Sequence, residues 1–437
     1  MTATGAQWRN WARTESARPI RVERPSSPGA VQRAVRAAAG SGLPIKAAGA
    51  GHSFTGIAVA TGVLLELDDL SGLVSVDRER RLATILAGTR LSEASRLLAG
   101  HGLAFENLGD IDRQTISGAI STGTHGTGIG FTGLAARVRA VTLVTGDGSL
   151  RRISAEESPE LLPAVSLGLG ALGILVDVTV ECVDAFVLSA VEAPEPLPDT
   201  VAAAESRARA NDHFEFYWFP HTDVALTKTN TRLPRGSARA PLARTRRWVD
   251  DELMANGVYR AVCATGAVVP GVVPALNRAA TRLTGSRRFA DHSHRVFTTP
   301  RSVRFAEMEY AVPVDSLPAV LAAIRDVIDA EGWRISFPLE VRFAAPDDVW
   351  LSTATGRESA YVAVHRYHRD AHTEYFRAAE EIFRRHDGRP HWGKIHYLGA
   401  DELGRLYPRF HDFLAVRDQF DPKRLFANPY LDRVLGS

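Results

Sequence analysis

The chain has 437 residues, of which 45% are hydrophobic and 23% are charged, and its formal net charge is +2 at pH 7. This length predicts two or three packed units, and the near balance of charge gives no indication of a nucleic-acid or membrane-surface partner. The two cysteines, Cys182 and Cys263, lie far apart without a metal-binding spacing, which suits a reducing compartment. Since we find neither a secretory signal nor an apolar run of the ~20 residues that a membrane span requires, we expect a cytoplasmic protein.

The first part of the chain is predicted to combine short strands, hairpins and helices. The helical spacing of apolar residues predicts helices at 25–40, 91–98 and 159–169. Apolar or alternating runs predict strands at 45–48, 63–67, 73–77, 82–87, 138–145, 149–153 and 174–180. This order lacks a regular βαβαβ alternation, so we predict one α+β unit over residues 1–182 and not a doubly wound sheet.

The second part, from residue 183 to about 400, is predicted to interleave strands with helices. Strands are predicted at 214–219, 224–231, 303–312, 335–343 and 361–367. Helices are predicted at 199–211, 316–331 and 374–386, with an exposed loop over 232–245 and a helical stretch after it. This pattern predicts a sheet that helices cover on one face, and residues 401–437 are predicted to form short helices and Asp-Pro turns.

Two glycine-rich segments are candidates for a nucleotide site. The first, Ala47-Ala-Gly-Ala-Gly-His-Ser-Phe-Thr55, follows a predicted strand, and its glycines would let backbone N–H groups approach a ligand. The second, a predicted loop over 117–128, offers backbone N–H groups and threonine hydroxyls without a carboxylate, which suits a pyrophosphate. We interpret the first loop as the cradle of a flavin, with His52 facing the flavin ring.

Three other kinds of site agree less well with the sequence. The segment Gly168-Leu-Gly-Ala-Leu-Gly173 matches the GxGxxG pattern, but a predicted helix precedes it and a strand follows, which is the reverse of a Rossmann fingerprint. No GxSxG elbow of a serine hydrolase is present in the sequence. The closely spaced histidines at 292/294 and 365/368 have no acidic third ligand at a telling spacing, so we predict no metal site.

Residues that could carry chemistry occur late in the chain. Glu340 and Arg342 are two apart in a predicted strand, so they share one face, where Arg342 would keep the carboxylate ionised and hold a substrate hydroxyl. The alternative is a surface ion pair, but the apolar flanking residues favour a buried strand. His365 lies in another alternating strand, and Lys394 belongs to the segment His391-Trp-Gly-Lys394. On the residues alone, a structural role for each of these is equally open.

Four segments together resemble the vanillyl-alcohol-oxidase type flavoproteins, and among them the aldonolactone oxidoreductases, with alditol oxidases as close cousins. These segments are Gly49-Ala-Gly-His-Ser-Phe54, Ile116-Ser-Gly-Ala-Ile-Ser-Thr-Gly-Thr-His-Gly-Thr-Gly128, Glu340-Val-Arg342 and His391-Trp-Gly-Lys394, and the similarity continues to Asn428-Pro-Tyr430. The resemblance implies a two-subdomain FAD-binding domain over residues 1–182 and an α+β cap domain with a large antiparallel sheet over 183–400. Residues 401–437 would return to the FAD-binding domain.

The resemblance also implies which residues contact FAD. His52 would be joined covalently to the 8α carbon of the flavin, as in relatives with a histidine at this place, whereas plant relatives without it bind FAD non-covalently. Further FAD contacts are expected at Ala48, Gly49, Ala50, Gly51, Ser53, Asp110, Thr115, Gly118, Thr122, Gly123, Thr124, His125, Gly173 and Ile174. Alditol oxidases have a serine where Asp110 stands, which favours a lactone as the substrate.

For activity, the resemblance implies oxidation of the C2 alcohol of an L-gulono-1,4-lactone or D-arabinono-1,4-lactone type substrate, with hydride passing to flavin N5. Arg342 and Lys394 would stabilise the developing alkoxide. Glu340 would orient the substrate hydroxyls, and His365 would act as the base. The electron acceptor would be oxygen, a quinone or a cytochrome, and Gly109 stands where some relatives carry an oxygen-blocking alanine. Two alternatives stay open: an alditol oxidase acting on a terminal alcohol, and a flavin-binding module without catalysis.

Overall fold

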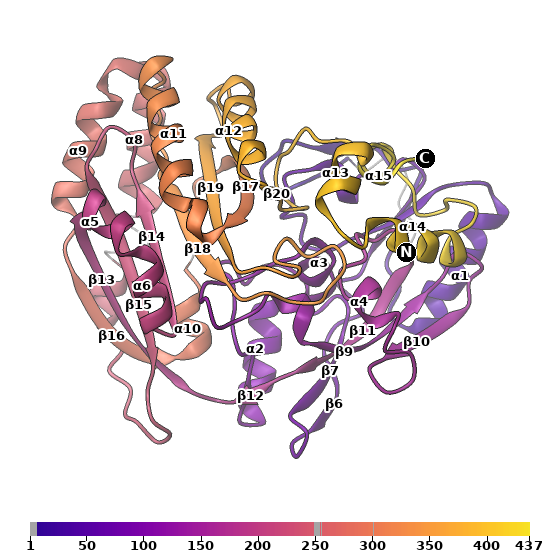
Figure 1. Ribbon diagram of the computed structural model, residues 1–437. Helices are drawn as coiled ribbons and strands as arrows, with labels where there is room; N and C mark the ends of the chain where they lie inside the picture. The colour runs from indigo at the N-terminus through magenta and orange to yellow at the C-terminus, as the bar shows by residue number, and fades with distance from the viewer. Residues whose placement is uncertain (1–6, 249–253, 255, 300) are drawn as a thin grey trace.

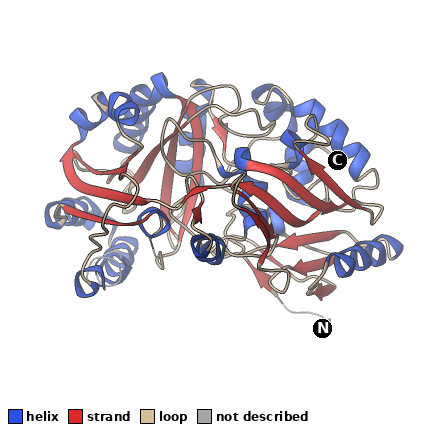
Figure 2. Cartoon of the chain, turned by 90° about the horizontal axis from the view of Figure 1, so that it is seen from below, coloured by secondary structure: helices blue, strands red, loops and turns tan. Residues whose placement is uncertain are grey.

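The computed structural model describes residues 7–248, 254, 256–299 and 301–437. Figure 1 shows three parts: an N-terminal region in indigo and purple, a large sheet with helices in rose and orange, and C-terminal helices in yellow that lie against the N-terminal region. Seen from below, the strands form two groups with helices on their outer sides (Figure 2). Among the described residues, every helix is too short or too polar to cross a bilayer.

A small parallel sheet and a larger antiparallel sheet build the N-terminal region. The parallel sheet has the order β3(Arg21–Glu23)-β5(Val63–Glu66)-β4(Ile45–Ala48), and helix α1(Pro28–Gly40) packs on it through apolar residues at helical spacing. The antiparallel sheet has the order β10(Leu150–Ser154)-β9(Val138–Val144)-β11(Ile174–Glu181)-β7(Leu82–Leu86)-β6(Leu73–Asp77). Other elements of this region are β1(Trp8–Arg9), β2(Ser16–Ala17), α2(Leu91–Gly100), β8(Leu103–Ala104), α3(Ile116–Thr122), α4(Leu162–Val165) and β12(Val183–Asp184).

An eight-stranded antiparallel sheet forms the middle of the molecule. Its order is β16(Arg287–His292)-β13(Val187–Pro196)-β15(Val224–Arg232)-β14(His213–Trp218)-β18(Leu339–Ala344)-β19(Ser359–Tyr367)-β17(Phe305–Pro313)-β20(Arg389–Pro390). The helices of this part are α5(Leu197–Ala202), α6(Ala204–Ala210), α7(Arg244–Arg247), α8(Tyr259–Val268), α9(Val273–Leu283), α10(Ser293–Phe297), α11(Leu317–Ala330) and α12(Thr373–Arg385). These elements confirm the predicted α+β fold with a large antiparallel sheet.

The two faces of this sheet differ in chemistry because side chains alternate along each strand. One face carries Phe214, Phe216, Met308, Val341 and Phe343, which pack with α6, α11 and α12 in one apolar cluster. The residues between them are polar. Glu215, Glu307, Glu309, Glu340, Arg342 and His365 are buried, and Tyr217 is partly buried. The sheet is therefore apolar toward its helices and charged on the opposite face.

The last helices, α13(Ala400–Leu406), α14(Phe410–Phe420) and α15(Pro429–Leu435), pack into the core of the N-terminal region. Phe413 and Leu431, both fully buried, belong to the same apolar cluster as Leu91 and Ile116. Asn428 fixes this return, because its side-chain amide donates to the backbone carbonyls of residues 56, 57 and 59. The domain boundaries at 182 and 400 stay predictions.

The main differences from the predicted elements have local causes. Residues 117–122 of the expected loop 117–128 belong to helix α3(Ile116–Thr122), because the Thr115 side chain accepts from the backbone N–H of Gly118 and caps the turn. Only residues 162–165 of the expected helix 159–169 are helical, and the expected helix 199–211 is two helices, α5 and α6. Strands β13 and β16 were not predicted. Part of the helical stretch expected after 245 lies outside the described residues.

Candidate active site

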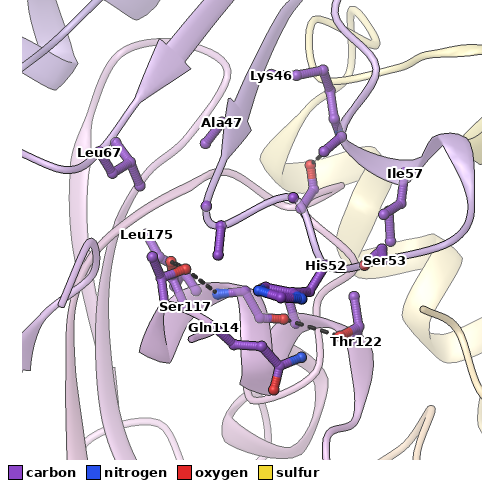
Figure 3. Close-up of a pocket in the computed structure, with 18 of the residues that line it drawn as sticks. Lys46, Ala47, His52, Ser53, Ile57, Leu67, Gln114, Ser117, Thr122 and Leu175 are labelled. Atoms are coloured by element: carbon purple, nitrogen blue, oxygen red, sulfur yellow. Dashed lines mark hydrogen bonds between the residues drawn. The ribbon is translucent and has the colours of Figure 1, made fainter. Parts of the chain in front are cut away.

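A cavity of about 850 Å³, counted out to its open mouth, lies in the N-terminal region. Its wall comes from the loop after β4, from α3 and from the turn that precedes β11 (Figure 3). Among the described residues of this wall, Lys46 and His52 are the titratable ones, and there is no carboxylate. Small residues, hydroxyls and backbone groups without acidic side chains suit a long ligand that carries phosphates.

Most of the residues predicted to contact FAD line this cavity. They are Gly49, Ala50, Gly51, His52, Ser53, Thr115, Gly118, Thr122, Gly173 and Ile174. Five others do not form its wall: Ala48, Asp110, Gly123, Thr124 and His125. Two of these, Asp110 and His125, lie instead among the charged residues of the large sheet.

Two glycines of the first loop are required by the geometry. A Cβ atom on Gly49 would lie 2.2 Å from Oγ1 of Thr115, the residue that caps α3. Gly51 has a φ of 67°, which is in the left-handed region that side chains with a Cβ rarely adopt. The loop can therefore approach α3 closely and present its backbone to the cavity only with glycine at these positions.

His52 projects from this loop into the cavity (Figure 3). Burial, and to a smaller degree Arg90 and Lys394, lower the pKa of His52 to about 4. Its ring stacks on Trp11, with ring centroids 5.7 Å apart. A neutral imidazole keeps a nitrogen lone pair at neutral pH, which is the form that a covalent link to a flavin requires.

Several residues of the wall were missed by the sequence reasoning. Lys46 is buried on β4, and its Nζ donates to the carbonyl oxygens of Gly170 (3.0 Å) and Phe426 (3.1 Å). Gln114 also lines the cavity, next to Ser117 of the second glycine-rich segment. Gly170 and Gly173 also line the cavity, so the segment 168–173 borders it although the segment is not a Rossmann fingerprint. The sequence did contain a signal for Lys46, because a lysine inside a predicted apolar strand indicates a buried amine that needs hydrogen-bond acceptors.

The charged face of the large sheet brings Glu340 and Arg342 together, as their spacing predicts. Arg342 Nη2 contacts Glu340 Oε1, Arg342 Nε lies 3.1 Å from Glu215 Oε2, and Nη2 lies 3.4 Å from Asp110 Oδ1. The Tyr217 hydroxyl donates to Glu340 Oε1 at 2.8 Å. One guanidinium is therefore shared by three carboxylates, and Glu215 and Tyr217 are partners that the sequence did not predict.

Sharing Arg342 changes the expected protonation of Glu340. Burial raises the pKa of Glu340, and the opposing effect of Arg342 does not overcome it. Burial would also raise the pKa of Asp110, but Arg301 and Arg342 hold it well below its usual range, and Arg301 Nη2 lies 2.6 Å from Asp110 Oδ2. Arg342 therefore favours ionisation of Glu340 less strongly than the sequence predicts, because Asp110 and Glu215 share the same cation.

Lys394 and His365 meet at Glu307. Lys394 Nζ contacts Glu307 Oε2, and His365 Nε2 lies 3.4 Å from Glu307 Oε1. Burial opposes ionisation of Glu307, but Lys394 and then His365 lower its pKa to about 2. Side-chain oxygen or nitrogen atoms of Glu307, Glu340 and His365 all lie within 4.8 Å of one another. The group around Arg342 and the group around Lys394 therefore form one site. The four residues predicted to be catalytic thus come together.

Within the part of the chain that the structure describes, two histidine–glutamate groups have the spacing of metal ligands, namely His125/Glu309/His391 and Glu307/Glu340/His365. In the first, His391 Nδ1 accepts the Gly393 backbone N–H, so a neutral ring carries its proton on Nε2 and has no free lone pair. Burial lowers the pKa of His391 to about 3, which keeps this ring neutral. In the second, the Lys394 ammonium is already paired with the Glu307 carboxylate and would repel a metal cation. Neither group suits a metal ion.

Comparison with known proteins agrees with this geometry. Residues 178–434 match the family model described as D-arabinono-1,4-lactone oxidase, and residues 19–154 match an FAD binding domain. The chain belongs to this FAD-dependent family. It is 40% identical to L-gulono-1,4-lactone dehydrogenase of Mycobacterium tuberculosis over 98% of this chain and 99% of the relative. It is 33% identical to alditol oxidase of a Streptomyces species, with 98% of both chains covered.

The fold also occurs in a more distant solved structure. Cholesterol oxidase from B. sterolicum superposes with a TM-score of 0.83 at 18% sequence identity, covering 100% of this chain and 97% of the other. At this identity the likeness concerns the fold alone. It confirms the predicted vanillyl-alcohol-oxidase type arrangement, and the cavity in the N-terminal region is the place where the residues fit FAD.

Proposed function

We propose that this protein oxidises the C2 alcohol of a sugar 1,4-lactone, of the L-gulono-1,4-lactone or D-arabinono-1,4-lactone type. The observation that carries the proposal is the convergence of Glu340, Arg342, His365 and Lys394 on one buried sheet face. FAD supplies the acceptor for the hydride. The family match and the 40% identical lactone dehydrogenase support the choice of substrate class.

The residues of the sheet face would divide the chemistry between them. His365 Nδ1 lies 2.8 Å from the carbonyl oxygen of Pro338, so Nδ1 carries a proton. Glu307, the carboxylate that faces Nε2, is already paired with the Lys394 ammonium, so Nε2 needs no proton in the resting enzyme and can accept one. A proton arriving at Nε2 would be stabilised by Glu307, which makes His365 the proposed base. Arg342 and Lys394 would stabilise negative charge on the substrate oxygen, and Glu340 with Tyr217 would orient the neighbouring hydroxyls.

The charge balance of this face suits a neutral, polyhydroxylated substrate. The carboxylates are Asp110, Glu215, Glu307, Glu309 and Glu340, and the cations paired with them are Lys228, Arg301, Arg342 and Lys394. Every one of these side chains has a charged partner, and His125 also lies beside Glu309, so a substrate would exchange hydrogen bonds with groups that are already paired. A sugar lactone offers hydroxyl donors and acceptors of this kind.

An alditol oxidase is the second candidate, and the 33% identical relative of that name favours it. Asp110 argues for the lactone, since its carboxylate pairs with Arg301 and Arg342 at a position where the alditol oxidases are expected to have serine. A lactone carbonyl could bind beside these guanidinium groups. We also propose a cytoplasmic location, for which the two buried, unpaired cysteines are the support.

The covalent link through His52 is part of the proposal. Acid precipitation should leave the yellow colour with the polypeptide in the wild type, and the His52→Ala variant should release its flavin while it stays folded. A wild-type protein that already releases its flavin on precipitation would exclude the link. The matched control is His101→Ala, which removes an exposed histidine at the end of α2.

The substrate is tested by mixing the oxidised enzyme anaerobically with a panel of 1,4-lactones and open-chain polyols. Bleaching of the flavin absorbance by lactones is the expected result, bleaching by polyols alone would favour the alditol oxidase, and no bleaching would favour a module without catalysis. Reoxidation of the bleached enzyme with oxygen, a quinone analogue or cytochrome c then identifies the acceptor. Gly109 stands where some relatives carry an oxygen-blocking alanine, so reactivity with oxygen is one of the outcomes that this test separates.

A further inference from the structure

Lys394 has two carboxylates within reach. Glu307 and Glu309 are two apart on β17 and therefore share a face. Lys394 Nζ contacts Glu307 and lies 3.9 Å from Glu309 Oε2. Of the two glutamates, Glu307 is the one whose carboxylate also faces His365. The glutamate that holds Lys394 therefore decides the charge around His365.

His125 is the partner of the other glutamate. His125 Nε2 lies 3.3 Å from Glu309 Oε1, and the exposed fractions of the two residues are 6% and 4%. The ring stacks on Tyr361 with centroids 3.6 Å apart. Its Nδ1 lies 2.9 Å from the carbonyl oxygen of Gly126, which can only accept, so Nδ1 carries a proton. A neutral ring would then present an Nε2 lone pair to a carboxylate, so the contact requires one more proton between His125 and Glu309.

We propose that His125 is a positioning residue: by sharing a proton with Glu309 it neutralises that carboxylate, and Lys394 consequently stays on Glu307 beside His365. This inference rests on the proposed function for its kinetic readout. It also gives His125 a role at the substrate face, where the family resemblance had implied a contact with FAD.

The surroundings of Glu309 agree with this role. Burial would raise the pKa of Glu309, but His125 and then Lys394 hold it well below its usual range. The charged and titratable groups that face the pair come from separate elements: Glu307 from β17, Tyr361 from β19, and His391 and Lys394 from the segment after β20. The carboxylate of Asp110 also contributes to raising the pKa of Lys394, after Glu307 and Glu309. His391 cannot take over from His125, because its Nδ1 lone pair is held by the Gly393 backbone N–H.

The test compares His125→Gln with the double variant His125→Gln/Glu309→Gln. The single variant leaves a buried, unpaired carboxylate that attracts Lys394, so reduction of the flavin by lactone should slow by ~10-fold or more and its pH profile should shift. Removing the charge of Glu309 as well should restore the rate to within ~3-fold of the wild type, and the pH profile of flavin reduction should return to that of the wild type. A double variant no faster than the single one would overturn the proposal, as would a single variant identical to the wild type.

Wild-type enzyme is measured first with the same lactone. If its flavin is not reduced, the proposed function fails, whereas a reducible wild type with no rescue in the double variant overturns the role of His125 alone. Crystal structures give a readout that does not depend on turnover. Lys394 should contact Glu309 in His125→Gln and Glu307 in the double variant, and a lysine that stays on Glu307 in the single variant would contradict the mechanism. If His125→Gln does not fold, His125→Asn is crystallised in its place, and a lysine that stays on Glu307 in that variant likewise contradicts the mechanism.

Discussion

The cavity of the N-terminal region and the charged face of the large sheet hold ligands by different means. The described wall of the cavity contains glycines, hydroxyls, apolar side chains, Gln114, His52 and one lysine, without a carboxylate. The sheet face instead concentrates Glu215, Glu307, Glu309, Glu340 and Arg342 in buried positions. Shape and backbone hydrogen bonds suit a cofactor that stays bound, because they do not depend on the charge state of the ligand. Paired charges suit a reaction centre, because they respond when charge develops on the substrate.

This comparison predicts that a charge deleted from the sheet face impairs chemistry without releasing the cofactor. Arg342→Ala should reduce the rate of flavin reduction by lactone by at least ~10²-fold, the scale of one lost transition-state contact, while the flavin content stays normal. Stopped-flow absorbance measures the rate. Arg325→Ala, which removes a surface arginine paired with Asp223, is the control and should behave as the wild type. Loss of flavin in Arg342→Ala would break the distinction between the two regions.

The converse prediction concerns the cavity. Gly49→Ala places a Cβ atom 2.2 Å from Thr115 Oγ1, so the loop must move away from α3 and the purified protein should have lost most of its flavin. The ratio of visible to ultraviolet absorbance measures the flavin content. Gly40→Ala is the matched control, because a Cβ atom there has no neighbour within 4 Å. If Gly49→Ala keeps its flavin but loses activity, then the loop belongs functionally to the reaction centre.

A smaller effect, on stability, is expected from replacing Lys46. Among the described residues of the cavity wall, Lys46 is the one lysine, and there is no arginine. Burial lowers the pKa of Lys46 to about 7, and its two acceptors are backbone carbonyls of Gly170 and Phe426. Lys46→Met would leave these carbonyls without their donor and should lower the free energy of unfolding by about 1–3 kcal/mol. Denaturant unfolding measures it, with exposed Lys423→Met as the control. Equal stability of the two variants would mean that the carbonyls find other partners.

The smallest effect is a dependence of stability on pH that comes from buried neutral histidines. Burial lowers the pKa of His396 and of His391 to about 3, compared with an ordinary value of 6.5. Below pH 6.5 the unfolded chain binds protons that the folded protein does not, so stability is lost as the pH falls from 6.5 toward 3. Each such histidine should cost about 1–2 kcal/mol between pH 6.5 and 5.

His396→Gln should therefore show a weaker loss of stability than the wild type when urea unfolding at pH 7.5 is compared with unfolding at pH 5. The exposed His101→Gln should show the wild-type loss. A His396→Gln variant with the wild-type pH dependence would indicate that the His396 ring becomes protonated in the folded protein. The buried surroundings of His396 would then tolerate a positive charge.

By itself, the sequence determined the local elements and the residues that meet through local geometry. Apolar periodicity predicted most strands and helices, and the spacing of Glu340 and Arg342 predicted their shared face because a strand alternates at every residue. The glycines of the loop at 49–51 indicated a backbone cradle for the same kind of local reason. The family motifs then placed FAD and the lactone chemistry.

Only the tertiary structure decided which distant side chains share a charge. Arg342 has three carboxylates around it because β14 pairs with β18 and because Asp110 approaches from the N-terminal region. His125 faces Glu309 although 184 positions separate them in the chain. Lys394 lies within reach of both Glu307 and Glu309. Protonation in a buried cluster depends on every neighbour at once, and strand order and loop approach set those neighbours, which no local pattern encodes.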